Sequence, residues 1–218
     1  ACQRVAKDPG TIYNPLFIYG RSGLGKTHLL MATQNEIRKN NPDANILYTT
    51  SENFTNDMVS FLAQKNMEEF HNKYRTVDVL LIDDVQFLQN KMGFQEEFFH
   101  TFNALTQVGK QVILTSDRPP REIDTLTDRL RNRFESGLLA DIQPPDIETR
   151  MAIVKKKAQQ FQMELSPQIV EYVAEKLKNN IRQLEGAVKK IFAMSSLTGN
   201  APTIDMAEEA IRDVQTDN

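Results

Sequence analysis

The chain has 218 residues, of which 40% are hydrophobic and 25% are charged, an ordinary mixture for one large domain or a domain with a small appendage. Its formal net charge of −3 excludes the global basic excess that is typical of a self-sufficient binder of double-stranded DNA. The single cysteine, Cys2, excludes an internal disulfide framework. No apolar run approaches the roughly 20 residues of a membrane span, and a signal peptide is not evident, so we expect a cytoplasmic protein.

The first 143 residues predict strands that alternate with helices. Residues 1–7 read as the end of a helix, which Pro9 and Gly10 stop. Short apolar runs predict strands at 16–19, 46–49, 77–82, 111–115 and 138–142. Helical patterns cover 28–39, 51–74 with a break near 65–66, 95–108 and 126–134. This alternation predicts an α/β fold with a parallel sheet, in which the nearly pure aliphatic third run is central.

The character of the chain changes after Pro144 and Pro145. Helical periodicity then covers 148–161, 167–177, 181–197 and 203–214. Ser166 is a good N-cap for the second of these helices, because Pro167 follows it at the first helical position. We therefore expect an α/β domain over residues 1–143 and a small all-helical lid over residues 144–218.

A glycine-rich turn at residues 20–27 has the sequence GRSGLGKT, which matches the Walker A pattern of a P-loop. Its glycines let backbone N–H groups point at a β-phosphate, and the helix that begins near Lys26 adds its positive dipole end. Lys26 is expected to reach the β- and γ-phosphates, and the Thr27 hydroxyl to ligate Mg²⁺. The motif follows an apolar strand and opens a helix, which argues against an accidental turn. The expected nucleotide-binding residues are Gly20, Gly23, Leu24, Gly25, Lys26 and Thr27.

Two carboxylates end the aliphatic run at residues 79–82. Open α/β sheets bind ligands at the carboxyl ends of their strands. We therefore expect Asp83 to hold Mg²⁺, directly or through water, and Asp84 to polarise an attacking water. An apolar run that ends in two acids is by itself equally typical of an ordinary strand edge. Its pairing with the Walker A motif favours the functional interpretation.

Three further polar points each allow two interpretations. Asp117, after the fourth strand, either senses a γ-phosphate or caps the turn that follows. Residues 129–133 carry three arginines, so this helix is either a solvated basic face or the source of an arginine finger for a neighbour's ATP. Arg182 either reaches the γ-phosphate from the lid or forms a surface pair with Glu185 at i, i+3.

Together these motifs resemble one family. The matching segments are residues 13–20, 23–29, 81–88, 96–103, 115–120, 128–134 and 184–187. They are similar to the AAA+ ATPase domain, domain III, of the bacterial chromosomal replication initiators called DnaA, over nearly the whole chain. The resemblance implies that Asp117 is the first sensor, Arg182 the second and Arg133 the arginine finger. With Asp83 and Asp84, these residues form the expected catalytic set.

The resemblance also implies partners. Members of the family bind ATP or ADP tightly, hydrolyse ATP slowly and self-associate in a right-handed helical filament on origin DNA when ATP is bound. Residues 51–74 match the insertion that lines the filament channel, and Val59 and Lys91 fall where the family contacts single-stranded DNA. The replicative helicase is a further candidate partner.

This sequence departs from the family pattern in several places. Arg21 and Ser22 stand where many members have glycine and valine, and Met92-Gly93 follows Lys91 where others place charged or polar residues. We therefore expect weak single-strand contact in this fragment. The family's C-terminal helix-turn-helix and the segment before Ala1 are missing, so we expect a piece trimmed to the ATPase domain.

The sequence thus predicts an ATP-dependent switch of replication initiation, with weak ATPase activity and with ATP or ADP and Mg²⁺ as ligands. The alternative is a helicase loader or another AAA+ remodelling ATPase, which would bind a helicase rather than assemble on origin DNA. A conventional P-loop kinase or GTPase is disfavoured, because residues 90–93 read NKMG and miss the aspartate of the guanine-reading Asn-Lys-x-Asp pattern.

Overall fold

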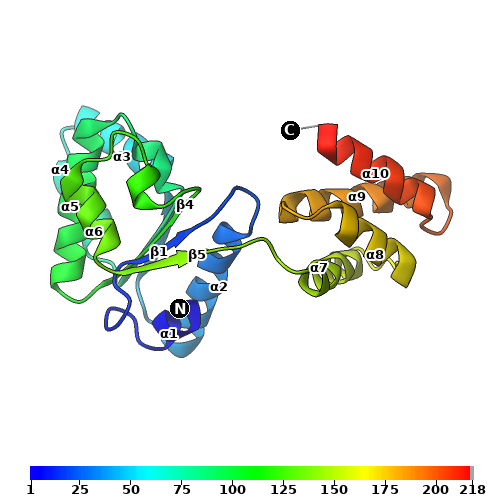
Figure 1. Cartoon of the computed structure of the whole chain (residues 1–218). Helices are drawn as coiled ribbons and strands as arrows, with labels where there is room; N and C mark the ends of the chain where they lie inside the picture. Colours follow the sequence, from blue (N-terminus) through cyan, green and yellow to red (C-terminus); the bar gives the residue numbers. More distant parts are fainter. Residues whose placement is uncertain (217–218) are drawn as a thin grey trace. The chain divides into compact units, whose positions relative to one another are not determined.

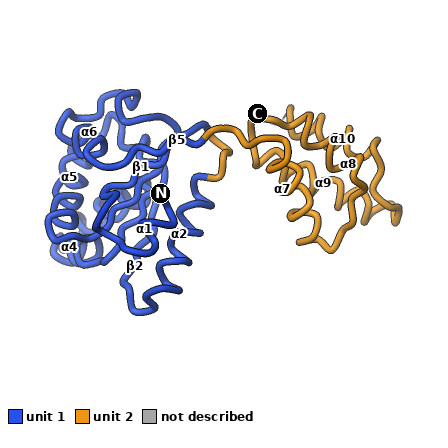
Figure 2. The backbone as a smooth tube through the Cα atoms, turned by 60° about the horizontal axis from the view of Figure 1, so that its bottom comes forward, with its two compact units in different colours: residues 1–21, 26–142 blue, residues 22–25, 143–218 orange. Residues whose placement is uncertain are grey.

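The computed structural model describes residues 1–216, so the last two residues of the expected lid lie outside the described part. The chain divides into two compact units (Figure 2). The first comprises residues 1–21 and 26–142, and the second comprises residues 22–25 and 143–218.

The first unit is built on a five-stranded parallel sheet (Figure 1). The strands are β1 (Leu16–Tyr19), β2 (Ile46–Thr50), β3 (Val79–Asp83), β4 (Gln111–Ser116) and β5 (Leu138–Asp141). Their order is β2-β3-β4-β1-β5, and every pair is parallel. β3 and β4 are buried at every position, as a central strand covered on both faces must be. The predicted α/β fold with a parallel sheet is confirmed.

The register brings four polar strand ends to one edge of the sheet. Thr50 pairs with Asp83 across β2 and β3, and Tyr19 pairs with Ser116 across β1 and β4. Because all strands run the same way, the loops that follow β1, β3 and β4 leave from this edge. This edge is where an open α/β sheet binds ligands.

The two faces of the sheet have different cores. α1 (Cys2–Lys7) and α2 (Lys26–Asn40) cover one face (Figure 1). On this side, α2 contributes its own Leu30 and Ile37 to the core. The other face carries α3 (Ser51–Ala63), α4 (Met67–Arg75), α5 (Met92–Gln107) and α6 (Asp128–Glu135). Its core is aromatic: the ring of Phe54 packs edge-on against those of Phe70, Tyr74 and Phe98 at centroid distances of 4.9–5.3 Å. Edge-on geometry is favoured by the quadrupoles of aromatic rings.

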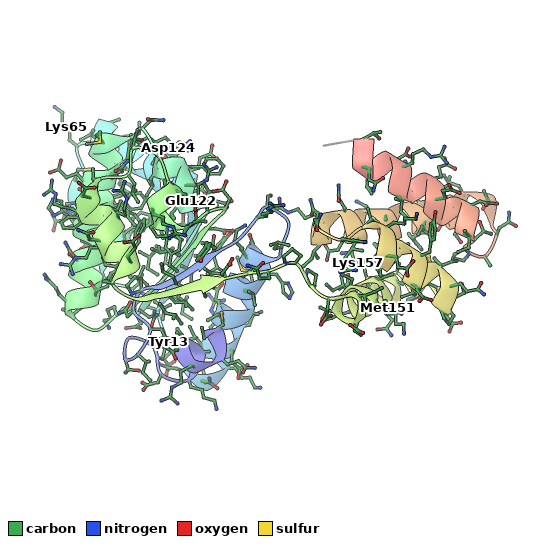
Figure 3. All side chains as sticks on the ribbon, viewed as in Figure 1. Tyr13, Lys65, Glu122, Asp124, Met151 and Lys157 are labelled. Carbon is green, nitrogen blue, oxygen red and sulfur yellow. The ribbon has the colours of Figure 1, made fainter. Side chains whose placement is uncertain are left out.

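The predicted pair of helices at residues 51–74 is present. The Thr50 hydroxyl caps α3 by accepting from the Asn53 N–H, and the Asn66 side chain caps α4 by accepting from the Glu69 N–H. Lys65 takes a left-handed conformation between them, with φ 55°, and is labelled in Figure 3. The break predicted near residues 65–66 is explained by the left-handed residue, which ends the first helical segment, and by the N-cap directly after it, which begins α4.

The helix predicted at residues 95–108 begins earlier than expected. α5 starts at Met92, and Lys91 precedes it without a side-chain cap. Neither a capping side chain nor a polar first turn marks this start in the sequence. The packing of Phe94 against the aromatic core favours the added turn, as tertiary contacts commonly override weak local signals.

Up to residue 216, the second unit contains four helices. They are α7 (Ile147–Gln160), α8 (Pro167–Lys176), α9 (Ile181–Thr198) and α10 (Ile204–Thr216). Each of the first three begins with a side-chain N-cap that accepts a hydrogen bond from a backbone N–H: Asp146 for α7, Ser166 for α8 and Asn180 for α9. Met151 and Lys157, labelled in Figure 3, lie on α7, where Met151 packs on the core of this unit. Over residues 1–216 we find no helix with the length and apolar character that crossing a membrane requires.

Two 3₁₀ turns complete the first unit. η1 (Val85–Leu88) follows β3, and η2 (Pro120–Glu122) follows β4. η1 begins directly after β3, at the edge where the polar strand ends gather, so it places Gln86 next to the candidate site described below, whereas η2 packs against α6.

Candidate nucleotide-binding site

The loop between β1 and α2 needs its glycines for two separate reasons. Gly20 and Gly23 have φ values of 155° and 81°, which L side chains rarely adopt. A Cβ atom on Gly20 would lie 2.6 Å from the carbonyl oxygen of Ile142, within the first unit. In the second unit, a Cβ atom on Gly23 would lie 2.0 Å from the side-chain oxygen of Asn180. Gly25 also has a positive φ, of 89°, and Leu24 between them is buried.

Lys26 opens α2 directly behind this loop. Its side chain is buried, and its Nζ donates to the carbonyl oxygens of Gly20 at 2.7 Å and Arg21 at 3.1 Å. The ammonium group is therefore held inside the curve of the loop, beside the N-terminus of a 15-residue helix. Both the charge and the helix end favour an anion at this place.

Asp83 ends β3 as a buried carboxylate surrounded by hydroxyl donors. Its Oδ2 accepts from the Thr27 Oγ1 at 2.6 Å and from the Tyr48 hydroxyl at 3.2 Å, and its Oδ1 accepts from the Thr115 Oγ1. Burial, followed by the charge of Asp83, raises the pKa of Tyr48 to about 12, so this phenol is a neutral donor near pH 7. The two residues predicted to ligate Mg²⁺, Thr27 and Asp83, are thus in direct contact.

The chemistry of these donors fits Mg²⁺, which prefers oxygen ligands and is usually held by one or two protein groups together with phosphate and water. In the described residues we find no cluster of three or more His, Cys, Asp or Glu that could hold a metal ion. An ion at Thr27 and Asp83 would therefore need phosphate and water oxygens to complete its coordination.

Asp84 is held in a strained left-handed conformation, with φ 58° and ψ 53°. Its N–H donates to the Thr115 Oγ1 at 3.0 Å, and its carbonyl oxygen accepts from the Ser51 Oγ at 2.6 Å. Its carboxylate accepts from the Gln86 Nε2 at 3.1 Å. These three contacts over-determine the conformation of a residue that sequence reasoning placed beside the attacking water.

Four of these contact residues were missed by sequence reasoning. They are Tyr48, Ser51, Gln86 and Thr115. For Ser51, Gln86 and Thr115, the available signal was a hydroxyl or amide near the carboxyl end of a strand or just after it, whereas Tyr48 lies in the middle of β2. That signal becomes informative only when β2 and β4 are known to flank β3.

Asp117 lies near this group, but its carboxylate is engaged by its own neighbour. It forms a bidentate pair with Arg118, with distances of 2.8 Å to Nε and 2.9 Å to Nη2. The Asp117 N–H donates to the Gln86 Oε1 at 3.4 Å. The alternative interpretation as a turn cap was wrong, because η2 begins without a side-chain cap. A sensor role for Asp117 stays a prediction.

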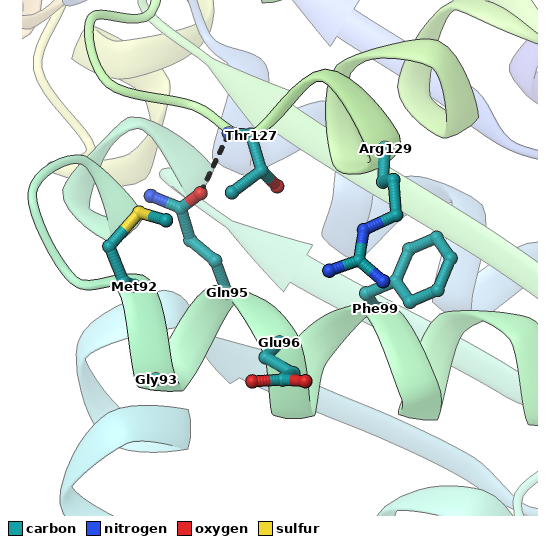
Figure 4. A pocket seen from close by; sticks show the side chains of 7 residues that line it. All are labelled: Met92, Gly93, Gln95, Glu96, Phe99, Thr127 and Arg129. Carbon is teal, nitrogen blue, oxygen red and sulfur yellow. Dashed lines mark hydrogen bonds between the residues drawn. The ribbon is translucent and has the colours of Figure 1, made fainter.

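The arginine-rich segment forms α6, as predicted, and its arginines have different surroundings. The Arg129 guanidinium lies 5.6 Å from the ring centroid of Phe99, and Arg131 pairs with Asp128 at 2.7 Å. Arg133 is exposed. Arg129 is one of the residues that line a pocket of about 120 Å³. Figure 4 shows these residues and the hydrogen bond that the Thr127 N–H donates to the Gln95 Oε1. An arginine-finger role for Arg133 stays a prediction.

Arg182 lies at the start of α9 in the second unit. Its Nη1 is 3.4 Å from the Ser22 Oγ, and the N–H of Ile181 donates to the Gly23 carbonyl at 2.8 Å. The alternative i, i+3 pair with Glu185 was wrong, because Glu185 instead lies 3.8 Å from the Lys157 Nζ. Within this unit, the arginine predicted as the second sensor therefore contacts Ser22 of the glycine loop, and its neighbour Ile181 contacts Gly23.

The two residues predicted to contact DNA lie on different elements. Val59 is 54% exposed on α3, where Leu62 lies three residues further along and is 58% exposed. Lys91 is half-buried at the start of α5, beside the exposed Met92. Their role in DNA contact stays a prediction.

The parallel sheet, the glycine loop with its buried lysine and the paired acids at the end of β3 define a P-loop nucleotide-binding domain of the AAA+ type. A family model described as the bacterial DnaA ATPase domain matches residues 1–141. The chain belongs to the bacterial DnaA ATPase domain family.

Individual relatives agree with this assignment. The chain is 54% identical over 214 residues to the chromosomal replication initiator protein DnaA of Caldanaerobacter subterraneus subsp. tengcongensis. That alignment covers 98% of this chain and 48% of the relative, so the chain spans about half the length of that protein.

Two solved structures extend the comparison. Domain III of the replication initiation protein DnaA of Thermotoga maritima superposes with a TM-score of 0.93 at 45% identity, over 98% of this chain and 89% of that one. A replication initiator DnaA bound to AMPPCP and single-stranded DNA superposes with a TM-score of 0.80 at 42% identity, over 91% of this chain and 60% of that one.

Proposed function

We propose that this chain is the ATP-binding and ATP-hydrolysing switch of a chromosomal replication initiator, and that its ATP-bound form assembles on origin DNA to promote duplex opening. The observation that carries the proposal is the contact of Thr27 with the buried Asp83, next to Lys26 in its glycine loop. A hydroxyl, a carboxylate and an ammonium group in this arrangement suit a nucleotide triphosphate with Mg²⁺.

The proposed chemistry assigns a role to each group. Lys26 and the N-terminus of α2 bind the phosphate oxygens. Thr27 and Asp83 would hold the Mg²⁺, which when bound neutralises charge on the phosphates. Asp84 orients a water and accepts its proton as the water oxygen bonds to the γ-phosphorus and the bond to ADP breaks. Turnover is slow, so the bound nucleotide acts mainly as a signal.

Assembly would depend on Arg133. The residue is exposed on α6, so a neighbouring copy could receive it at the γ-phosphate of its own ATP. The exposed Val59 on α3 and Lys91 at the start of α5 are proposed to contact single-stranded DNA. The solved relative that holds both AMPPCP and single-stranded DNA supports this combination of ligands.

Sedimentation velocity of the chain with Mg²⁺ tests the proposal, in ATP or ADP, each with and without oligo-dT. We expect larger species only with ATP, and further growth with the single strand. Arg133→Ala should weaken assembly and leave ATP affinity nearly intact, whereas the exposed Arg121→Ala on η2 serves as the control. A loss of ATP affinity with assembly unchanged would contradict the proposed role of Arg133 in a neighbour's site.

A further inference from the structure

Gln86 joins two parts of the candidate site. It lies in η1, its side chain is 7% exposed, and both ends of its amide are engaged. The Nε2 donates to the Asp84 Oδ1 at 3.1 Å, and the Oε1 accepts from the Asp117 N–H at 3.4 Å. One short planar group thus connects the second acid after β3 with the loop after β4.

The remaining contacts of Asp84 leave the orientation of its carboxylate to Gln86. Ser51 and Thr115 hold the backbone carbonyl and N–H groups of Asp84, and so fix its main chain. Gln86 contacts the carboxylate itself. A donor on Oδ1 fixes the plane of a carboxylate, and therefore also the direction of the lone pairs on Oδ2.

A second buried glutamine in the same unit shows what a structural role looks like. Gln95 is fully buried, donates to the carbonyl oxygens of Leu88 and Thr125, and accepts from the Thr127 N–H. All its partners are backbone groups, which is the usual way in which a buried amide is satisfied. Gln86 differs because one of its partners is the carboxylate of Asp84.

We infer that Gln86 is a positioning residue, which orients the Asp84 carboxylate toward the attacking water. Through its second hydrogen bond, Gln86 makes this orientation depend on the position of the backbone at Asp117. The inference rests on the proposed function, in which Asp84 accepts a proton from that water. The amide of Gln86 is rigid, so a shift of the backbone at Asp117 turns the carboxylate of Asp84. A loop next to the γ-phosphate would in this way control hydrolysis without touching the water itself.

The test replaces Gln86 with Met, which keeps the length and volume of the side chain and removes both hydrogen bonds. We expect the single-turnover rate of ATP hydrolysis by Gln86→Met to fall about tenfold or more, a fraction of what a well-oriented general base contributes. ATP affinity, measured by equilibrium binding, should stay within about twofold. Gln86→Glu keeps an acceptor for Asp117 but loses the donor, so it should be as slow as Gln86→Met.

A double-mutant cycle separates positioning from a general structural effect. In an Asp84→Asn background, adding Gln86→Met should lower the residual rate of hydrolysis by less than twofold, because the carboxylate that Gln86 orients is already absent. Gln111→Met removes a buried amide at the first residue of β4, at the end of this strand away from Asp117, and serves as the matched control. It should lower the melting temperature and leave the hydrolysis rate of the folded protein unchanged.

The possible results are distinguishable. An unchanged hydrolysis rate for Gln86→Met would overturn the inference, and so would an equal loss of rate in the presence and absence of the Asp84 carboxylate. In both cases, ATP hydrolysis by the wild-type chain would still support the proposed function. Absence of ATP binding and hydrolysis in the wild-type chain would overturn both.

Discussion

The two ends of β4 are both polar and buried, yet they are built differently. At its start, the Gln111 side chain donates to the carbonyls of Tyr13 and Val112 and accepts from the Gly10 N–H. At its end, Thr115 donates to the carboxylate of Asp83 and accepts from the Asp84 N–H.

The difference lies in the partners. The amide at the first end bonds only to backbone groups, and Asn14 nearby does the same with Lys110 and Val112. These amides are uncharged and their hydrogen-bonding groups are paired with the backbone, so their contacts stabilise the local backbone conformation. At the second end, side-chain hydroxyls surround a charged group. A metal ion, or an oxygen atom of phosphate or water, can interact with such a group of side chains. An amide whose hydrogen bonds are already made offers these ligands no further interaction. The comparison predicts that one end controls stability and the other controls nucleotide chemistry.

Lys26→Ala should produce the largest effect, and only on nucleotide binding. The buried ammonium would make charge-assisted hydrogen bonds to phosphate, so its loss should cost about 3–5 kcal/mol of ATP binding. Isothermal titration with ATP and Mg²⁺ measures the change. Lys39→Ala, on the exposed last turn of the same helix, should bind ATP like the wild type. Equal affinity for Lys26→Ala and the wild type would remove the lysine from the phosphate site.

Gln111→Ala should have the next largest effect, on stability alone. The change leaves the Gly10 N–H and two carbonyl oxygens without their partner at a fully buried position and opens a cavity. We expect a loss of about 2–4 kcal/mol in the free energy of unfolding, measured with urea. ATP affinity of the folded protein should be unchanged. A large loss of affinity at full folding would show that the two ends of β4 are not independent.

The sequence predicted much of this arrangement, because several of its signals are local. The apolar runs at 16–19 and 77–82 and the glycine pattern around Lys26 each need only neighbouring residues to be read. The break between the two helices near residues 65–66 and the helical periodicity after Pro145 are equally local. These elements were placed within a few residues of their positions in the structure.

The surroundings of the acids could not be predicted in the same way. Tyr48 and Thr115 reach Asp83 because β2 and β4 flank β3, and the order of strands in a parallel sheet is set by packing between distant segments. The pairing of Asp117 with Arg118 depends on the rotamers of two side chains. Sequence patterns carry little information about either.

Thr115→Val tests the second end with a change of nearly constant shape. It removes the donor to Asp83 and the acceptor for the Asp84 N–H, so we expect a loss of about 1–2 kcal/mol of stability from two hydrogen bonds. Unlike Gln111→Ala, it should also slow ATP hydrolysis, because Asp83 and Asp84 both lose a contact. Urea unfolding and single-turnover hydrolysis on the same preparation give the two values. A loss of stability with normal hydrolysis would make Thr115 a structural residue like Gln111.

A carboxylate away from both ends of β4 provides the smallest predicted effect. Asp57 on α3 accepts from the Tyr74 hydroxyl at 2.6 Å and the Lys73 Nζ at 2.5 Å, so its donors include a phenol, as those of Asp83 do. Burial by itself would raise the pKa of Asp57, but the hydrogen bonds from Lys73 and Tyr74 outweigh it and lower the pKa below its usual range. Burial raises the pKa of Tyr74, and the hydrogen bond to Asp57 and the charge of that carboxylate raise it further.

Asp57→Asn should therefore cost about 1 kcal/mol at pH 7, with solvent screening of the partly exposed lysine keeping the value small. Because the folded pKa is lowered, this contribution is present above the unfolded value near pH 4 and is lost as pH falls through the folded value. Urea midpoints of the two proteins should therefore converge below about pH 4, and ATP hydrolysis should be the same in both at pH 7. A difference that does not shrink as pH falls below the unfolded value would mean that shape, and not charge, links α3 to α4. A change in hydrolysis would instead connect this surface carboxylate, through Ser51 at the start of α3, to the backbone of Asp84.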